Sequence, residues 1–364
     1  MKKKFWSILC LLFACAGLSA QQTDDFQWKV NNGGISIIGY TGQTRDIVIP
    51  STINGLPVTA IGDVAFSREV FDGEFHGINL SSVTIPDSVT LIGRGAFYGS
   101  LLTSVIIPGG VTYIGDLAFA SNQITNVTIP DSVTSIGIGA FANNQLTNVT
   151  IGNAVLSIGG WAFNMNQLTG ITIPDSVTFI GRWAFHGNQL TSVILGNSVA
   201  VIEEWAFFRN QITGVIIPNS LTSFGVGAFA SNHITSVNIP ESLAFIEAAV
   251  FSSNRLTSIT IPSNITRIGS RSFSGNLLES VIIPPGVTNV GGGAFARNPL
   301  TSVTIGANVS FGISYRAGIR EGVITDRDGD RLRDALFEEA YENADRQAGT
   351  YIRPNSDSTT WIRK

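Results

Sequence analysis

The chain has 364 residues and a formal net charge of −4, and only 13% of its residues are charged. Its 22 Lys and Arg are outnumbered by 26 Asp and Glu, so it lacks the clustered cations that phosphate binding requires, and no nucleic-acid partner is expected. Glycine is abundant, at 39 residues, and lysine is almost absent after Lys4, a composition typical of a repetitive, exported protein.

The amino terminus has the features of an export signal. Lys2 to Lys4 form a basic region, and the apolar run that begins at Phe5 is too short to span a bilayer comfortably. Two processing routes are open. Cleavage after Ala20 would make residues 1–20 a signal peptide, whereas LFAC at 12–15 resembles a lipobox, with Phe at an atypical position, and would leave a lipid on Cys15. Both routes predict an exported protein that is secreted or held at the outer surface.

No later segment reaches about 18 consecutive apolar residues, so no internal membrane span is expected. Cys10 and Cys15 are the two cysteines, and both lie in the leader. The mature chain is therefore predicted to have no disulfide, and its stability must come from packing.

A 22-residue repeat dominates the rest of the chain. A large aliphatic residue recurs at this step from Ile85 to Ile305, and phenylalanine keeps the same step from Phe97 to Phe295, without insertion or deletion. The unit reads approximately LTSVTIPDSVTSIGxGAFAxNQ. One unit cannot bury its own apolar face, but stacked copies bury a continuous one. Residues 47–305 are therefore predicted to form a single solenoid domain.

The alternation inside one unit predicts which side chains face the core. In LTSVTIP, residues such as Val105 and Ile107 point inward from an extended segment, and the following proline ends the strand because it has no N–H to donate. A second inward cluster, represented by Ile136 and Phe141, follows a turn. We expect one parallel sheet of about 11–12 strands, with short non-strand turns on the other side.

Asparagine recurs three places after each phenylalanine, from Asn122 to Asn298. Its amide can both donate and accept hydrogen bonds, so it is suited to bonding turn backbone in adjacent coils. The row is predicted to form an asparagine ladder along the solenoid.

The pattern L-T-S-V-T-I-P-x-S-V-T-S-I-G-x-x-A-F resembles the BspA-like leucine-rich repeats of bacterial surface proteins. The resemblance covers roughly residues 47–305, where many consecutive copies carry both I-P and A-F. The unit is one residue shorter than is usual in the family, and asparagine stands where the family usually has cysteine. The resemblance implies a leucine-rich-repeat solenoid and a role in adhesion to host matrix proteins and cells.

The flanks are predicted to be caps. Residues 21–46 contain FQWKV, the turn NNGG and ISIIGY, which predict a β-hairpin over the first coil. Between Phe66 and Leu80 the register is interrupted by a longer loop. Residues 306–364 are much richer in charge. LRDALFEEAYENA, from Leu332, has apolar residues at helical spacing, and AGTYIRPNSDSTTWIRK predicts a closing strand pair, so we expect a C-terminal α/β cap.

The sequence argues against catalysis. It has three histidines and lacks His-Glu-x-x-His, Gly-x-Ser-x-Gly and a phosphate-binding loop. The adjacent carboxylates Glu203 and Glu204 are interpreted as a solvated surface. We therefore expect neither an enzymatic activity nor a cofactor.

Three aspartates invite a calcium hypothesis. Asp326, Asp328 and Asp330 alternate in TDRDGDRLRD, and carboxylates at such spacing suit a hard cation. An EF-hand loop has Gly at its sixth position and Glu at its twelfth, where this chain has Arg331 and Phe337. We therefore predict a charged turn with no metal, and keep calcium as the alternative.

The site two places before each repeat phenylalanine varies most in size. Because packed interiors do not tolerate such variation, the repeat is expected to leave this position free, with its tryptophans partly exposed and stacked along the solenoid. Successive copies hold Val64, Gly95, Leu117, Gly139, Trp161, Trp183, Trp205, Gly227, Ala249, Arg271 and Gly293.

The three tryptophans and their variable neighbours are the candidate binding surface, because Trp and Arg are enriched at binding hot spots. The neighbours are Arg182, His186, Glu204, Phe208 and Arg209. The alternative is a structural ladder of rings that shields the turn.

The resulting prediction is a monomeric, secreted or surface-anchored binding or adhesion module for an extracellular protein or glycan. Two other classes stay open. One is a structural spacer of the envelope or matrix, and the other is a carbohydrate-binding module that uses the tryptophans.

Overall fold

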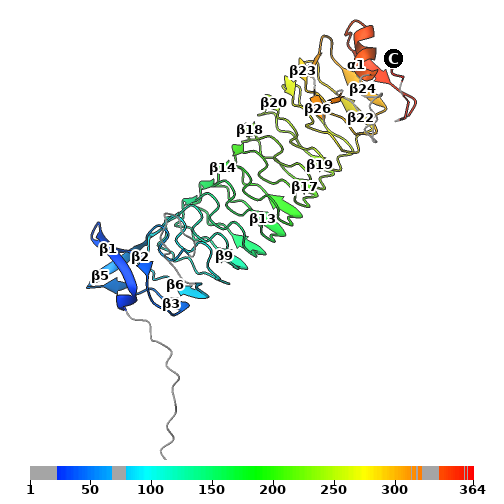
Figure 1. Ribbon diagram of the computed structural model, residues 1–364. Coiled ribbons are helices and arrows are strands. Elements are labelled where there is room, and N and C mark those ends of the chain that lie inside the picture. Colours follow the sequence, from blue (N-terminus) through cyan, green and yellow to red (C-terminus); the bar gives the residue numbers. More distant parts are fainter. Residues whose placement is uncertain are drawn as a thin grey trace, which may run out of the picture.

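The computed structural model describes residues 23–67, 79–312, 314–316, 319–321, 336–355, 357–358 and 360–364. Its coils stack into an elongated β-solenoid, with a β-hairpin at one end and the α-helix α1 at the other (Figure 1). The predicted solenoid of 22-residue repeats is confirmed. The export signal, the lipobox at Cys15, the interrupting loop and the three calcium-site aspartates lie outside the described residues, and the proposals about them stay predictions.

Each coil passes through three segments, and these give the solenoid three faces. Face A carries the S-V-T strands, face B carries the T-S-I strands, and face C carries the turns around each Ala-Phe pair. Strands of successive coils pair in parallel at a step of one repeat, so Ile136 on face B lies between Ile114 and Ile158.

Face B contains the longest sheet. Its strands in order are β1 (Phe26–Asn31), β2 (Gly34–Tyr40), β5 (Leu56–Ile61), β7 (Leu91–Ile92), β8 (Tyr113–Ile114), β10 (Ser135–Ile136), β12 (Ser157–Ile158), β14 (Phe179–Ile180), β16 (Val201–Ile202) and β18 (Ser223–Phe224), with β4 (Thr52–Ile53) beside β5. A second sheet on this face contains β20 (Phe245–Ile246), β21 (Arg267–Ile268), β23 (Asn289–Val290) and β25 (Ser310–Phe311).

Face A is built of shorter sheets. They pair β3 (Asp46–Val48) with β6 (Ser82–Thr84), β9 (Asn126–Thr128) with β11 (Asn148–Thr150), β13 (Gly170–Thr172) with β15 (Ser192–Ile194), and β17 (Gly214–Val215) with β19 (Ser236–Val237). At the carboxyl end lies the sheet β22 (Ser280–Ile282), β24 (Ser302–Ile305), β28 (Gly349–Ile352) and β29 (Ile362–Arg363), and β26 (Ser314–Arg316) pairs with β27 (Ile319–Glu321).

The presence of strands on two faces differs from the predicted single sheet with non-strand turns opposite. The S-V-T strands are the more interrupted set because most end at a proline, such as Pro130, which cannot extend a ladder. The T-S-I strands are followed mostly by glycine, and the Gly137 N–H donates to the Ile114 carbonyl of the preceding coil at 2.9 Å. The backbone ladder therefore continues past each of these short strands.

The core lies between the three faces. Val127 from face A, Ile136 from face B and Phe141 from face C are all buried. The phenylalanine rings stack along the axis with nearly parallel planes and centroids 5.0–6.0 Å apart. This spacing is close to the strand separation of about 4.8 Å. One ring per coil therefore fills the core in register with the backbone.

The asparagine ladder closes the corner beside face C. Asn188 Nδ2 donates to the carbonyls of Phe163 and Phe185 at 2.9 and 3.1 Å, and its Oδ1 accepts from the Leu168 N–H at 3.0 Å. The amide thus joins its own coil to the preceding one, so the predicted ladder between coils is confirmed, with each amide reaching one neighbouring coil and not both. The other members, all buried, are Asn122, Asn144, Asn166, Asn210, Asn232, Asn254, Asn276 and Asn298.

Phe224 interrupts this regular stacking. At the same buried position on face B, the other coils from Ile61 to Val290 hold isoleucine or valine. The Phe224 ring stands edge-on to Phe229 and Phe251, with centroids 6.1 and 5.8 Å away. Phe229 and Phe251 are 6.0 Å apart, as are Phe251 and Phe273, and the long sheet ends at β18 without pairing to β20. The face B ladder is therefore interrupted between these two coils at the larger ring, whereas β17 still pairs with β19 on face A.

The hydrogen bonding on face A also differs at this junction. At four other places on this face, Ile49, Ile129, Ile173 and Ile283, the backbone makes this bond, as where the Ile173 N–H donates to the Ile194 carbonyl at 2.8 Å. At the junction beside Phe224, the side chain of Asn238 makes the hydrogen bonds to the neighbouring backbone. Its Oδ1 accepts from the Ile217 N–H at 3.0 Å, and its Nδ2 donates to the Ile217 carbonyl at 2.9 Å. We call this junction between residues 214–231 and 236–253 the seam.

Both ends of the solenoid are covered. The hairpin β1–β2 turns through Asn32 and Gly33, which both have positive φ, and β2 then pairs with β5 of the first coil. A short 3-10 helix, Thr23–Asp25, precedes it. At the other end, α1 (Leu336–Asn343) buries Tyr341, whose hydroxyl donates to the Gly306 carbonyl at 2.8 Å. The predicted hairpin, helix and closing strand pair are thus present.

Replacing Asn188 with alanine is expected to lower the free energy of unfolding by about 3 kcal/mol. The change removes three buried hydrogen bonds, and each buried group that loses its partner costs about 1–3 kcal/mol. Urea unfolding followed by circular dichroism measures the loss. The control is Thr191→Ala, an exposed position whose loss should stay near 0.5 kcal/mol. Equal stability of the two variants would contradict the role of the ladder.

Phe224→Ile is expected to let the coils at the seam close up. Amide hydrogen exchange at residues 244–247 should slow as the face B ladder becomes continuous. The free energy of unfolding should change by less than about 1.5 kcal/mol, because the neighbours repack. Phe207→Ala in the ring stack should cost about 3–5 kcal/mol. Unchanged exchange at 244–247 in the Phe224 variant would show that the ring does not cause the seam.

Candidate binding surface

The positions two places before each repeat phenylalanine share one backbone conformation. All have φ between +52° and +66°, from Val64 to Gly293. A left-handed φ costs a non-glycine residue on the order of 1 kcal/mol. Stacking holds the backbone in place, since the Trp183 N–H donates to the Glu204 carbonyl of the next coil at 3.0 Å. The side chain at this position can therefore vary between repeats, but the backbone conformation is as constrained as that of the core.

Three successive copies of this site hold tryptophan on face C. Trp161 is 41% exposed, and Trp183 and Trp205 are partly buried, so the expected exposure is confirmed. Trp183 and Trp205 stack with centroids 5.8 Å apart and planes 27° from parallel. In the described part of the chain, Trp161 makes no ring contact with either of them. The expected row of three stacked rings is thus a stacked pair plus one separate ring.

Two more rings pack around the tryptophan pair. The His186 ring meets Trp183 edge-on at 4.7 Å, and the Phe208 ring meets Trp205 at 4.9 Å. His186 and Phe208 stack on each other at 5.4 Å, and the Arg209 guanidinium lies over the Phe208 ring at 5.2 Å. Residues from two successive coils, spaced by one repeat in sequence, thus form one aromatic cluster.

A polar group borders this cluster. Arg182 forms an ion pair with Glu204 at 3.4 Å, and its backbone N–H donates to a Glu203 carboxylate oxygen at 3.0 Å. Because the Arg182–Glu204 pair is exposed, it contributes about 0–1 kcal/mol. Both carboxylates therefore face one arginine.

His186 is held in its neutral form. Burial lowers the pKa of its imidazole, and the Arg209 guanidinium lowers this pKa further. The Asn164 amide nitrogen donates to His186 Nδ1 at 2.8 Å, and this bond requires an unprotonated Nδ1. The cluster therefore carries no charge on its histidine at neutral pH.

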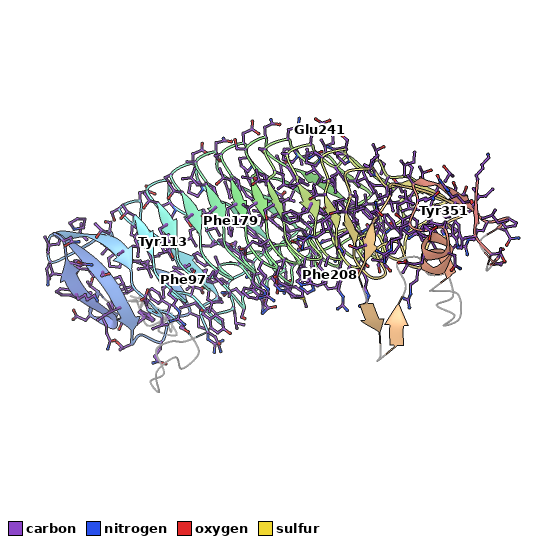
Figure 2. The ribbon with its side chains drawn as sticks, turned by 90° about the horizontal axis from the view of Figure 1, so that it is seen from above. Phe97, Tyr113, Phe179, Phe208, Glu241 and Tyr351 are labelled. Atoms are coloured by element: carbon purple, nitrogen blue, oxygen red, sulfur yellow. The ribbon has the colours of Figure 1, made fainter. Side chains whose placement is uncertain are left out.

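We refer to these residues together as the tryptophan patch. Met165 joins it, because this residue is 51% exposed and also has a positive φ. Phe208 marks the place of the patch in Figure 2. The patch consists of Trp161, Met165, Arg182, Trp183, His186, Glu204, Trp205, Phe208 and Arg209.

No group of three or more His, Cys, Asp or Glu side chains is placed to hold a metal ion within the described residues. The same residues contain no helix that is long and apolar enough to cross a membrane.

Comparison with known proteins gives one family match. A family model described as "BspA type Leucine rich repeat region (6 copies)" matches residues 68–191, 135–257 and 200–315 in overlapping stretches. No curated protein sequence matches.

Solved structures of other repeat proteins are similar. A leucine-rich repeat protein from Bacteroides ovatus is 21% identical over 79% of this chain and 89% of its own, with a TM-score of 0.52. The pneumococcal vaccine antigen PcpA is 21% identical over 79% of this chain and 82% of its own, with a TM-score of 0.50. A leucine rich cell surface protein from Faecalibacterium prausnitzii is 28% identical over 74% and 90%, with a TM-score of 0.42. The first two likenesses show a shared fold.

Acid is expected to weaken the patch through His186. The pKa of His186 in the fold lies below the unfolded value of about 6.5, so the unfolded chain takes up its proton first as pH falls. The stability that neutral His186 contributes is complete above about pH 6.5 and is lost below it.

The difference in unfolding free energy between the wild type and His186→Ala should therefore shrink between about pH 7.5 and pH 5. Urea unfolding at each pH measures it. A difference that stays constant over this range would show that the histidine does not titrate as described.

Proposed function

Because the chain belongs to the BspA type leucine-rich repeat family, we propose that it is a non-catalytic binding module that engages an extracellular protein through the tryptophan patch. BspA type repeats are typical of bacterial surface proteins, and solenoids of stacked repeats offer extended surfaces for binding. We extend this to the present chain and propose that it is secreted or held at the cell surface, with an adhesive role.

The observation that carries the proposal is the conformational free energy that the tryptophans lose by adopting a positive φ. Glycine meets the same left-handed requirement without strain in the coils of Gly139 and Gly227. Ring contacts of about 0.5–1.5 kcal/mol each offset the strain at Trp183 and Trp205. Trp161 has the same strained backbone, lacks such a contact in the described chain and stays 41% exposed. Fold stability alone thus gives a weak reason for tryptophan there.

A protein partner is favoured over a glycan by the way the rings are covered. Sugar rings stack on an open aromatic face. Trp205 has one face against Trp183, and its other side lies on Gly227, where an added Cβ would come within 2.2 Å of the ring. The edge of Phe208 packs against both tryptophans. Trp161 is the remaining ring, and one isolated platform is a small sugar site.

Replacing Trp161, Trp183 and Trp205 together with glycine should weaken binding at least tenfold, because exposed aromatic anchors dominate interface energies. The binding assay is surface plasmon resonance on immobilised fibronectin, laminin and collagen, with a glycan array in parallel. Leu117→Gly makes the same backbone change outside the patch and should bind like the wild type.

Each other outcome of this experiment counts against a part of the proposal. Equal binding by the triple variant and Leu117→Gly would remove the patch from the binding surface. Patch-dependent binding to the glycan array alone would replace the protein partner with a carbohydrate. Concentration-dependent self-association that the triple variant loses, measured by light scattering, would favour a structural spacer.

A further inference from the structure

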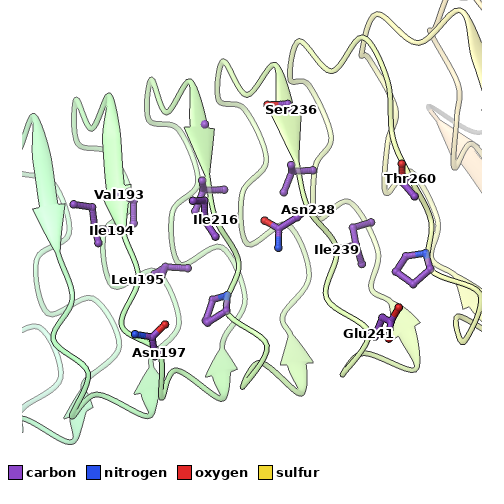
Figure 3. Close-up of a pocket in the computed structure, with 15 residues that line it drawn as sticks. Val193, Ile194, Leu195, Asn197, Ile216, Ser236, Asn238, Ile239, Glu241 and Thr260 are labelled. Atoms are coloured by element: carbon purple, nitrogen blue, oxygen red, sulfur yellow. The ribbon is translucent and has the colours of Figure 1, made fainter.

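A large hollow on face A lies over the seam. It has a volume of about 1040 Å³ and extends across four coils, from Val193 to Pro262 (Figure 3). Two other hollows on this face hold about 500 and 340 Å³. The hollow over the seam lies where the Phe224 ring packs against Phe251 in the core and the Asn238 side chain bonds the Ile217 backbone. We call this hollow the seam groove.

The floor of the seam groove is apolar and open. Ile194 and Ile216 project side by side from adjacent coils and are 63% and 80% exposed. In the same register several other coils place threonine, as at Thr172 and Thr260. Gly214 borders the two isoleucines, and no atom lies within 4 Å of where its Cβ would be. Neighbouring aliphatic side chains beside free space form a surface that gains from being covered.

One rim of the groove is acidic. Glu241 is the only charged residue among those that line the groove, and it is exposed. It occupies the place after the proline that ends the face A strand, where Asp131 and Asp175 stand in earlier coils. No lysine or arginine occupies this register from Asp87 to Ala307. The edge therefore has a single sign of charge and attracts cations.

The dimensions of the groove suit an extended chain. Four coils at about 4.8 Å spacing cover about 14 Å, which four or five residues in extended conformation span at about 3.3 Å each. We propose that the seam groove binds an extended peptide segment of a partner protein. Aliphatic side chains of the segment cover Ile194 and Ile216, and a lysine or arginine side chain pairs with Glu241. This site is separate from the tryptophan patch and does not depend on it.

A fluorescein-labelled positional-scanning library of hexapeptides tests this proposal by fluorescence anisotropy with the full chain. Selected peptides should carry isoleucine, leucine or valine at two positions and lysine or arginine at a third. Ile216→Thr, which copies the residue at Thr260, should weaken the best peptide at least fivefold. Glu241→Ser, which copies Ser263, should weaken cationic peptides and leave uncharged ones unchanged.

Matched controls separate this site from the rest of the solenoid. Ile282→Thr makes the same change in the same register outside the groove and should leave binding unchanged. The triple tryptophan variant should also bind the peptides normally. Phe224→Ile, with its fold checked by circular dichroism, should weaken binding by closing the seam. A library without residue preference, a preference for acidic peptides, or equal losses for Ile216→Thr and Ile282→Thr would overturn the proposal.

Discussion

The stacking of each coil on the next at one strand spacing is the constraint on which the rest of the molecule depends. The asparagine amides, the phenylalanine stack and the N–H groups of the left-handed turns all bond or pack one coil against its neighbour. A residue inserted into one coil would move all three out of register at once. This explains why the repeat keeps its length from Ile85 to Ile305 while the outward side chains vary.

Sequence variation between the repeats is therefore confined to side chains that leave the stacked backbone unchanged, and it appears on two faces. On face C, tryptophans at left-handed positions build the tryptophan patch. On face A, isoleucine at positions where other coils have threonine gives the seam groove an apolar floor. The seam shows what happens when variation enters the core instead. Phe224 keeps the apolar character of its position but not the volume; the face B ladder is interrupted there, and on face A the Asn238 side chain makes one of the bonds between the coils.

Periodicity made the solenoid, the phenylalanine stack and the asparagine ladder predictable, because each depends on residue type at a fixed step. The left-handed turns are harder to predict from the sequence. Glycine at Gly95, Gly139, Gly227 and Gly293 was a signal for positive φ, but the tryptophans between them suggested an unconstrained position. The seam could not be predicted from an apolar pattern, since Phe224 and the isoleucines of other coils are equivalent in it. The seam groove depends on the seam and is therefore not predictable from the sequence either.

The central claim is that the backbone of the coils does not depend on the side chains at the left-handed positions. A crystal structure of the chain with Trp161, Trp183 and Trp205 all replaced by glycine tests this claim most directly. The expected result is an unchanged backbone, with φ near +55° to +59° at the three positions and the Phe163–Phe185 ring spacing still close to 5.4 Å. Relaxation of these turns to negative φ, or a change in coil spacing, would contradict it. The tryptophans would then be part of what holds the coils in place.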